Sequence, residues 1–203
     1  MYMVQANTLA AGAHVLLYDG SPFAPTPDAF IKVIGDLKVT HLGSSPKYFS
    51  ELQMRKVSPR AMADLSSLAL VTSTGMVMSA GNFAWFYDHG FPAHTQIANM
   101  TGGTDTNAAI ALGNPLTPVY SGECHGFNTG IAGGVYALVD TLGGPVAGTP
   151  CAAGDPGELV ITKAFPTMPT QFWGPAGAAQ YRSSYFAKYD SKSRGGPPLP
   201  RAR

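Results

Sequence analysis

Apolar and polar residues alternate along the first half of the chain in blocks that predict strands and helices in turn. Four short apolar runs have the length of buried strands, at residues 13–20, 39–45, 68–75 and 94–100. Stretches with apolar residues at helical spacing lie between them, at residues 26–38, 46–56 and 79–90. The chain before residue 13 is also expected to be helical. This alternation predicts an α/β fold with a parallel, doubly wound sheet flanked by helices.

The second half of the chain changes character. Short apolar runs at residues 122–146 and 154–165 are divided by glycine and proline, which is typical of hairpins. We therefore expect a smaller antiparallel, barrel-like β region after the parallel sheet. The expected divisions are an α/β portion at 1–112, a β-rich portion of the same domain at 113–189, and a disordered tail at 190–203. The tail carries glycine, proline and scattered positive charge without apolar periodicity.

Composition narrows the class of protein. Hydrophobic residues make up 45% of the 203 residues and charged residues 12%, which is the balance of a folded chain. The net charge of +1 provides no basic field, so binding to nucleic acid or to an anionic membrane is not expected. A cytoplasmic protein is expected, because no apolar run reaches membrane-spanning length and the first residues lack the basic start of a secretory signal. Free thiols are expected at Cys124 and Cys151, with a single disulfide as the alternative.

Most short motifs that carry chemistry are absent from the sequence. There is no G-x-G dinucleotide fingerprint, no P-loop, no G-x-S-x-G, no H-E-x-x-H and no C-x-x-C. The five histidines are scattered along the chain. His41 lies in an apolar run and is expected in the core, and His125 is expected in a turn.

The segment "TGGTD", at residues 101–105, is the strongest candidate for chemistry. Glycines allow backbone N–H groups to approach a phosphate closely. Thr104 offers a hydroxyl to a phosphate oxygen, and Asp105 offers a carboxylate to Mg²⁺, which prefers carboxylate and phosphate ligands. The alternative is an ordinary Gly-Gly turn in which the aspartate caps a local backbone group.

A second Thr/Gly-rich segment, "TSTGMVM" at residues 72–78, also follows a predicted buried strand. The carboxyl ends of parallel strands meet at one edge of a sheet, and ligands of such sheets bind beyond that edge. We therefore expect residues 75–77 and 101–105 to lie close together at a shared site.

Several segments together resemble one family, the adenylate-forming acyl-CoA ligases of the AMP-dependent synthetase group. They occur in family order and with family spacing, and the resemblance extends to about Tyr189. The segments are 15–22, 42–52, 65–75, 101–105, 113–123, 156–173 and 181–186.

The resemblance implies a partial adenylation domain and a reaction in two steps. The carboxylate of a small-molecule acid attacks the α-phosphate of ATP, which gives an acyl-adenylate and pyrophosphate. The thiol of coenzyme A then displaces AMP. The implied cofactors are therefore ATP or AMP, Mg²⁺ and coenzyme A.

The resemblance also assigns roles to individual residues. Thr104 and Asp105 carry the catalytic roles, with Thr104 on the phosphate and Asp105 on Mg²⁺. The nucleotide contacts are implied at Gly75, Met76, Val77, Thr101 and Thr104. The acyl group is expected to lie against Gly102 and Gly103. Family members that act on acetate have tryptophan in place of Gly102, so glycine there implies room for a longer acid.

Other parts of the family pattern are not found among these 203 residues. They are the phosphate loop with its lysine, the aspartate that holds the ribose, and the small C-terminal domain with the adenylation lysine. The expected function is therefore that of a central fragment of a ligase, inactive as this isolated chain. The alternatives are a non-catalytic module that binds nucleotide or acyl-CoA, and an interaction module.

Overall fold

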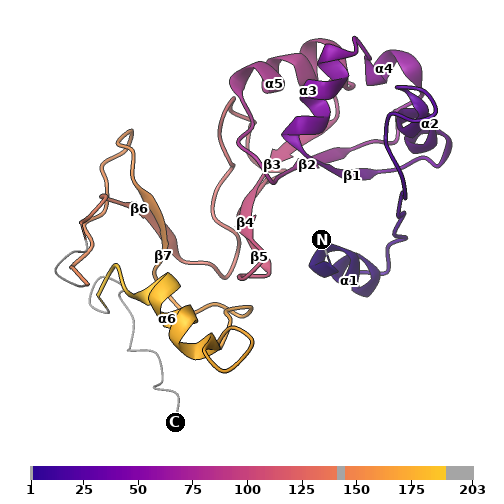
Figure 1. The fold of residues 1–203 in the computed structure, drawn as a ribbon. Coiled ribbons are helices and arrows are strands. Elements are labelled where there is room, and N and C mark those ends of the chain that lie inside the picture. The colour runs from indigo at the N-terminus through magenta and orange to yellow at the C-terminus, as the bar shows by residue number, and fades with distance from the viewer. Residues whose placement is uncertain (1, 141–144, 191–203) are drawn as a thin grey trace. The chain divides into compact units, whose positions relative to one another are not determined.

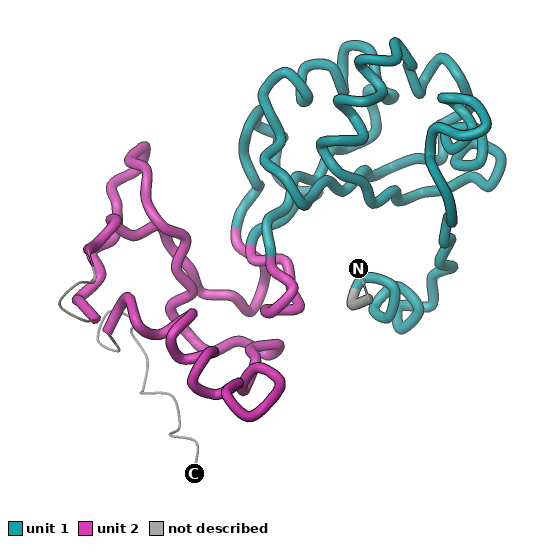
Figure 2. Tube along the Cα trace, in the orientation of Figure 1, with its two compact units in different colours: residues 1–102, 111–126 teal, residues 103–110, 127–203 magenta. Residues whose placement is uncertain are grey.

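The computed structural model describes residues 2–140 and 145–190 (Figure 1). The chain divides into two compact units (Figure 2). Unit 1 comprises residues 1–102 and 111–126, and unit 2 comprises residues 103–110 and 127–203. The expected division at residue 112 stays a prediction, and the expected tail lies outside the described residues from residue 191 onward.

Unit 1 is built on a parallel sheet of three strands in the order β1-β2-β3. The strands are β1 (His41–Ser44), β2 (Leu70–Ser73) and β3 (Gln96–Asn99). Leu42 pairs with Val71, and Val71 pairs with Ile97, so one row of apolar side chains crosses the sheet on a single face. Three of the four predicted strands are therefore present, and the parallel sheet is confirmed.

Helices pack on the face of this sheet that carries Leu42, Val71 and Ile97 (Figure 1). Ile31 and Ile34 of α2, together with Phe49 of α3, belong to the same buried core as those strand residues. The α/β fold with a parallel sheet flanked by helices is thus as expected. The helices of unit 1 are α1 (Tyr2–Ala10), α2 (Ala29–Asp36), α3 (Pro46–Met54), α4 (Pro59–Met62) and α5 (Ala80–Trp85).

Aromatic rings dominate the core between helices and sheet. Phe49, Phe86 and Phe91 are fully buried, and the rings of Phe86 and Phe91 stack with their centroids 4.5 Å apart. Phe86 begins a π-helical turn, η1 (Phe86–Gly90), which continues α5 and is closed by a bond from Phe91 N to Phe86 O of 2.8 Å. The single helix predicted over 79–90 is therefore correct in extent but changes its winding at Phe86.

The apolar run at residues 13–20 does not form the predicted strand. Leu16 and Leu17 are 48% and 69% exposed, although the ring of Tyr18 packs against Phe30 at 4.6 Å. A strand requires a neighbour for its backbone hydrogen bonds, and within the described residues this run has none. His41 was also placed wrongly, because it is exposed at the start of β1 rather than buried in the core.

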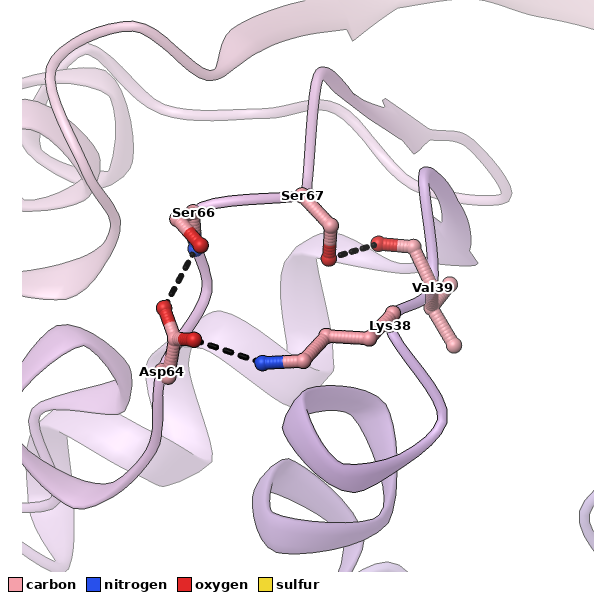
Figure 3. A network of polar contacts seen from close by, with 5 residues as sticks. All are labelled: Lys38, Val39, Asp64, Ser66 and Ser67. Carbon is pink, nitrogen blue, oxygen red and sulfur yellow. Dashed lines mark hydrogen bonds and ion pairs between the residues drawn. The ribbon is translucent and has the colours of Figure 1, made fainter.

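Polar contacts tie the loop after α2 to the loop that precedes β2 (Figure 3). Lys38 Nζ lies 2.6 Å from Asp64 Oδ2, and the amide of Ser66 donates to the other oxygen of Asp64 at 3.0 Å. Ser67 Oγ donates to the carbonyl of Val39 at 3.2 Å. The Lys38 ammonium and the donors of Ser66 hold the pKa of Asp64 well below its usual range. Lys38 has φ of +50°, in the left-handed region that non-glycine residues rarely adopt, and its amide donates to the carbonyl of Gly35 at 3.1 Å.

Unit 2 contains an antiparallel pair of strands and a helix. Strands β6 (Gly133–Tyr136) and β7 (Glu158–Ile161) pair antiparallel, which confirms the antiparallel β region expected in the second half. The helix α6 (Gly177–Phe186) was not predicted, because its residues show no apolar periodicity. A further two-stranded sheet pairs β4 (Thr101–Gly103) with β5 (Ala108–Ala111), and the chain passes from one unit to the other within each of these strands.

An aromatic cluster fixes α6 within unit 2. Phe172 contacts both Tyr181 and Tyr185 of the helix, with centroid distances of 5.4 and 6.0 Å. Tyr181 also contacts Tyr185 at 5.6 Å and Phe186 at 5.2 Å. These contacts orient the last turn of α6, which is where the hydroxyl of Tyr185 is presented.

Candidate functional site

Two of the predicted site segments leave the sheet of unit 1 at the same edge. Ser73, the last residue of β2, pairs with Asn99, the last residue of β3. The amide of Met100 donates to the carbonyl of Ser73 at 2.9 Å, which carries the pairing one residue beyond the strand. Because the strands are parallel, the loop after Ser73 and the chain after Asn99 begin side by side at the carboxyl edge. The expected edge is confirmed, whereas ligand binding there stays a prediction.

The loop after β2 presents two apolar side chains to solvent. Gly75 has φ of +91°, a conformation that glycine adopts without strain. Met76 and Val77 are 60% and 93% exposed, whereas Met78 is 2% exposed and anchors the loop to the core. Ser79 then caps α5 by accepting a hydrogen bond from the amide of Asn82. The loop thus presents two exposed apolar side chains at the carboxyl edge of the sheet.

The outer side of β3 is covered by residues 113–126 of the same unit. Gly113 lies so close to this strand that a Cβ atom there would be 2.4 Å from the Cβ of Ala98. Asn99 Nδ2 donates to the carbonyl of Glu123 at 3.3 Å and to Cys124 Sγ at 3.6 Å. Burial raises the pKa of the Cys124 thiol, and both cysteines are free, as expected.

His125 belongs to the same covering segment and is half-buried. Its Nδ1 accepts a hydrogen bond from the backbone amide of Asn114 at 2.7 Å. This contact gives His125 a structural role in holding the segment together.

The loop at residues 103–107 is closed by its own hydrogen bonds. Thr106 Oγ1 bonds to the carbonyls of Gly103 and Ala108 at 2.9 and 3.2 Å. Asn107 has φ of +46°, and its amide donates to the carbonyl of Thr104 at 3.2 Å. The alternative of a Gly-Gly turn is not what the structure shows, because both glycines lie in β4 and the turn follows at residues 104–107. Thr104 and Asp105 are exposed in this turn.

Two residues that come later in the sequence of unit 2 bind this loop through their side chains. Thr167 Oγ1 donates to the carbonyl of Thr106 at 2.7 Å. The hydroxyl of Tyr185 donates to Asp105 Oδ2 at 2.5 Å. The hydrogen bond to Asp105 raises the pKa of Tyr185 above its ordinary value. Sequence reasoning missed both partners, because they lie 61 and 80 residues from the groups they contact.

The donor set at Asp105 suits a metal ion that arrives with a nucleotide. Within the described residues, no group of three or more His, Cys, Asp or Glu side chains could hold a metal ion by itself. Mg²⁺ in nucleotide sites is commonly held by one or two carboxylates together with phosphate oxygens and water. One exposed carboxylate beside an exposed threonine hydroxyl fits that pattern, and it does not fit a metal site made only of protein ligands.

The predicted site residues thus fall into two groups. Gly75, Met76, Val77, Thr101 and Gly102 belong to unit 1, and all five follow strands that end at one edge of the sheet. Gly103, Thr104 and Asp105 belong to unit 2.

Comparison with known proteins gives the family. Residues 1–169 match the family described as AMP-binding enzyme. The chain belongs to this family. An acetoacetyl-coenzyme A synthetase of Rhizobium meliloti (strain 1021) is 39% identical over 186 residues, which cover 92% of this chain and 27% of that protein. A malonamoyl-CoA synthetase of Penicillium aethiopicum is 36% identical over 195 residues, covering 89% of this chain and 24% of that protein.

A solved structure supports the same relation. The acetoacetyl-CoA synthetase from Streptomyces lividans superposes with a TM-score of 0.79 at 31% identity, over 93% of this chain and 29% of that one. The chain therefore spans 24–29% of these relatives. Among the described helices, none has the length and hydrophobicity needed to cross a membrane.

Proposed function

We propose that this chain forms the adenine-binding edge and the metal-binding loop of an ATP-dependent acid–thiol ligase of the acetoacetyl-CoA synthetase type. The observation that carries the proposal is the carboxyl edge of the parallel sheet, from which both candidate loops start. Family membership and 39% identity to an acetoacetyl-coenzyme A synthetase support it. Because the chain spans 27% of that relative, the complete reaction is proposed for a protein of the family's full length, in the cytoplasm.

Each candidate residue then has a physical role. Met76 and Val77 provide the apolar surface for adenine, and Gly75 gives the loop the turn that presents them. Thr104 donates a hydrogen bond to a phosphate oxygen, and Asp105 holds the metal through a carboxylate oxygen. A bound Mg²⁺ supplies neutralisation of the negative charge that develops on the departing pyrophosphate.

The proposed substrate is a short acid with a second carbonyl group. Both acetoacetyl and malonamoyl groups, named in the relatives, carry a carbonyl two carbons from the thioester carbon. Gly102 and Gly103 are exposed and lack side chains, so they leave room for an acyl group longer than acetyl. We therefore assign Gly102 and Gly103 to the wall of the acyl site.

Replacing Asp105 with alanine is expected to abolish the binding of Mg-ATP to the chain. With only part of the site present, binding by the 203-residue chain should be weak, with a Kd of about 1 mM, or about −4 kcal/mol. Titration of Mg-ATP into the wild type and Asp105→Ala, followed by NMR shifts of the Gly75 and Val77 amides, measures the difference. Asp155→Ala, which removes another exposed carboxylate of unit 2, serves as the control and should bind like the wild type. Equal binding by wild type and Asp105→Ala would show that Asp105 has no part in nucleotide binding.

The 203-residue chain is expected to bind nucleotide without completing the reaction. The phosphate loop, the ribose aspartate and the adenylation lysine implied by the resemblance are not among its residues. Loss of one preorganised charge-stabilising group typically lowers the rate by about 10²–10³. Acetoacetate-dependent release of pyrophosphate from ATP by the purified chain is the measurement. Release above the rate without enzyme would contradict this expectation, whereas nucleotide binding without release would favour the binding-module alternative for the isolated chain.

A further inference from the structure

One hydrogen bond connects the candidate metal ligand to a helix that lies far from it in sequence. The hydroxyl of Tyr185, in the last turn of α6, donates to Oδ2 of Asp105 at 2.5 Å. Both residues belong to unit 2. Within the described residues, Oδ1 of Asp105 has no hydrogen-bond partner. The two oxygens of this carboxylate are therefore not equivalent.

The phenol is held in place by packing rather than by this hydrogen bond alone. The ring of Tyr185 contacts Phe172 and Tyr181 with centroid distances of 6.0 and 5.6 Å. Tyr181 is 7% exposed and so fixes the helix against the rest of unit 2. The loop that carries Asp105 is fixed independently, since Thr167 donates to the carbonyl of Thr106 at 2.7 Å. A positioned donor and a positioned loop thus meet at one carboxylate oxygen.

A carboxylate on an exposed loop rotates easily about its last torsion, so either oxygen can turn toward a ligand. A donor bonded to one oxygen removes that freedom before the ligand arrives. Hydrogen bonds of this kind orient metal-ligating carboxylates, and their loss typically lowers metal affinity about 10- to 100-fold.

We propose that Tyr185 is a positioning residue for Asp105. Its hydroxyl holds Oδ2 of Asp105, so that Oδ1 of the same carboxylate is presented to the metal ion of a metal–nucleotide complex. This inference rests on the proposed function of Asp105, and it adds a residue from α6 to the site. Tyr185 itself does not contact the metal or the nucleotide in this proposal.

The test uses the full chain and four variants: Tyr185→Phe, Asp105→Asn, the double variant, and the control Tyr120→Phe. Tyr185→Phe keeps the ring contacts and removes only the hydroxyl. Tyr120 is 59% exposed, compared with 49% for Tyr185, and its hydroxyl bonds to no described residue. The probe is Mn²⁺ with ATP, because paramagnetic broadening of the Gly103 and Thr104 amide signals reports binding at low occupancy.

The expected result is a loss of Mn-ATP affinity of about 10- to 100-fold in Tyr185→Phe and no loss in Tyr120→Phe. In the Asp105→Asn background, Tyr185→Phe should cause no further loss, since the group that it positions has already lost its charge. A purely structural role would lower affinity equally in both backgrounds and would overturn the proposal. Without ligand, the Cγ signal of Asp105 should shift in Tyr185→Phe and stay unchanged in Tyr120→Phe.

The outcomes separate this inference from the proposed function. If Asp105→Asn loses binding while Tyr185→Phe binds like the wild type, the proposed function stands and the positioning role is wrong. If Asp105→Asn binds like the wild type, or if the wild type does not bind Mn-ATP, the proposed function fails and the role of Tyr185 fails with it. An unchanged Asp105 Cγ signal in Tyr185→Phe would show that the hydrogen bond is absent in solution, which also overturns the proposal.

Discussion

Replacing Phe49 with alanine is expected to lower the free energy of unfolding by about 3–5 kcal/mol, the usual cost of removing a fully buried phenylalanine. Phe49 is 0% exposed, and its ring meets Phe86 and Phe91 edge to face at centroid distances of 6.0 Å each. Truncation removes both ring contacts and leaves a cavity between α3 and η1. A loss of this size is a large fraction of the 5–15 kcal/mol that stabilises a typical domain, so the sheet that carries the candidate site should unfold at low denaturant.

Urea unfolding followed by tryptophan fluorescence measures the effect. Trp85 packs against Phe91 at 6.5 Å and reports on this core, whereas Trp173 is 99% exposed and should change little. Met54→Ala is the matched control on the same helix, because Met54 is 71% exposed and should cost less than about 0.5 kcal/mol. A cost below about 1 kcal/mol for Phe49→Ala would mean that the aromatic cluster is not packed as described.

The sequence predicted the parallel sheet because its strands are short, apolar and separated by helical patterns. Leu42, Val71 and Ile97 all lie in predicted runs and align in one row across the sheet. The run at 13–20 has the same composition and is not a strand. Strand formation depends on a neighbouring strand as well as on composition, and the presence of a neighbour cannot be read from local sequence.

Helices were predicted where apolar residues repeat and missed where they do not. Tyr48, Phe49 and Leu52 recur at helical spacing and face the core, so α3 was expected. The helix α6 has glycine, alanine, serine and tyrosine without a repeating apolar side, and it is held by aromatic contacts to Phe172. Such a helix depends on tertiary packing, which overrides weak local propensity.

The residues of the candidate site also differ in whether local sequence could predict them. Asp105 and Gly75 could be proposed from sequence because Thr/Gly-rich loops after buried strands are a local signal. The contact of Tyr185 with Asp105 could not be predicted, because it joins residues 80 positions apart. The hydroxyl has no sequence pattern that distinguishes it from the other tyrosines of the chain, so only the packing of α6 identifies it.

Replacing Gly177 with alanine is expected to destabilise unit 2 by about 2–3 kcal/mol, the upper part of the usual range for inserting a methyl group into a filled space. A Cβ atom at Gly177 would lie 1.8 Å from the carbonyl oxygen of Phe172 and 2.5 Å from its carbonyl carbon. These are backbone atoms, so a side-chain rotation cannot relieve the overlap. The better helix propensity of alanine offsets at most about 1 kcal/mol.

The start of α6 must therefore move away from Phe172 in Gly177→Ala, and the helix carries Tyr185 with it. Hydrogen exchange of the α6 amides should accelerate, while the amides of β2 and β3 keep the exchange rates of the wild type. The Asp105 Cγ signal should shift in the same direction as in Tyr185→Phe, because the hydrogen bond is lost in both variants. Gly81→Ala is the control: its Cβ would meet only Ser79 Oγ, at 3.8 Å, and the methyl group should cause no loss of stability. Wild-type exchange rates throughout α6 in Gly177→Ala would mean that the helix does not start against Phe172, and the argument for a fixed Tyr185 would lose its structural basis.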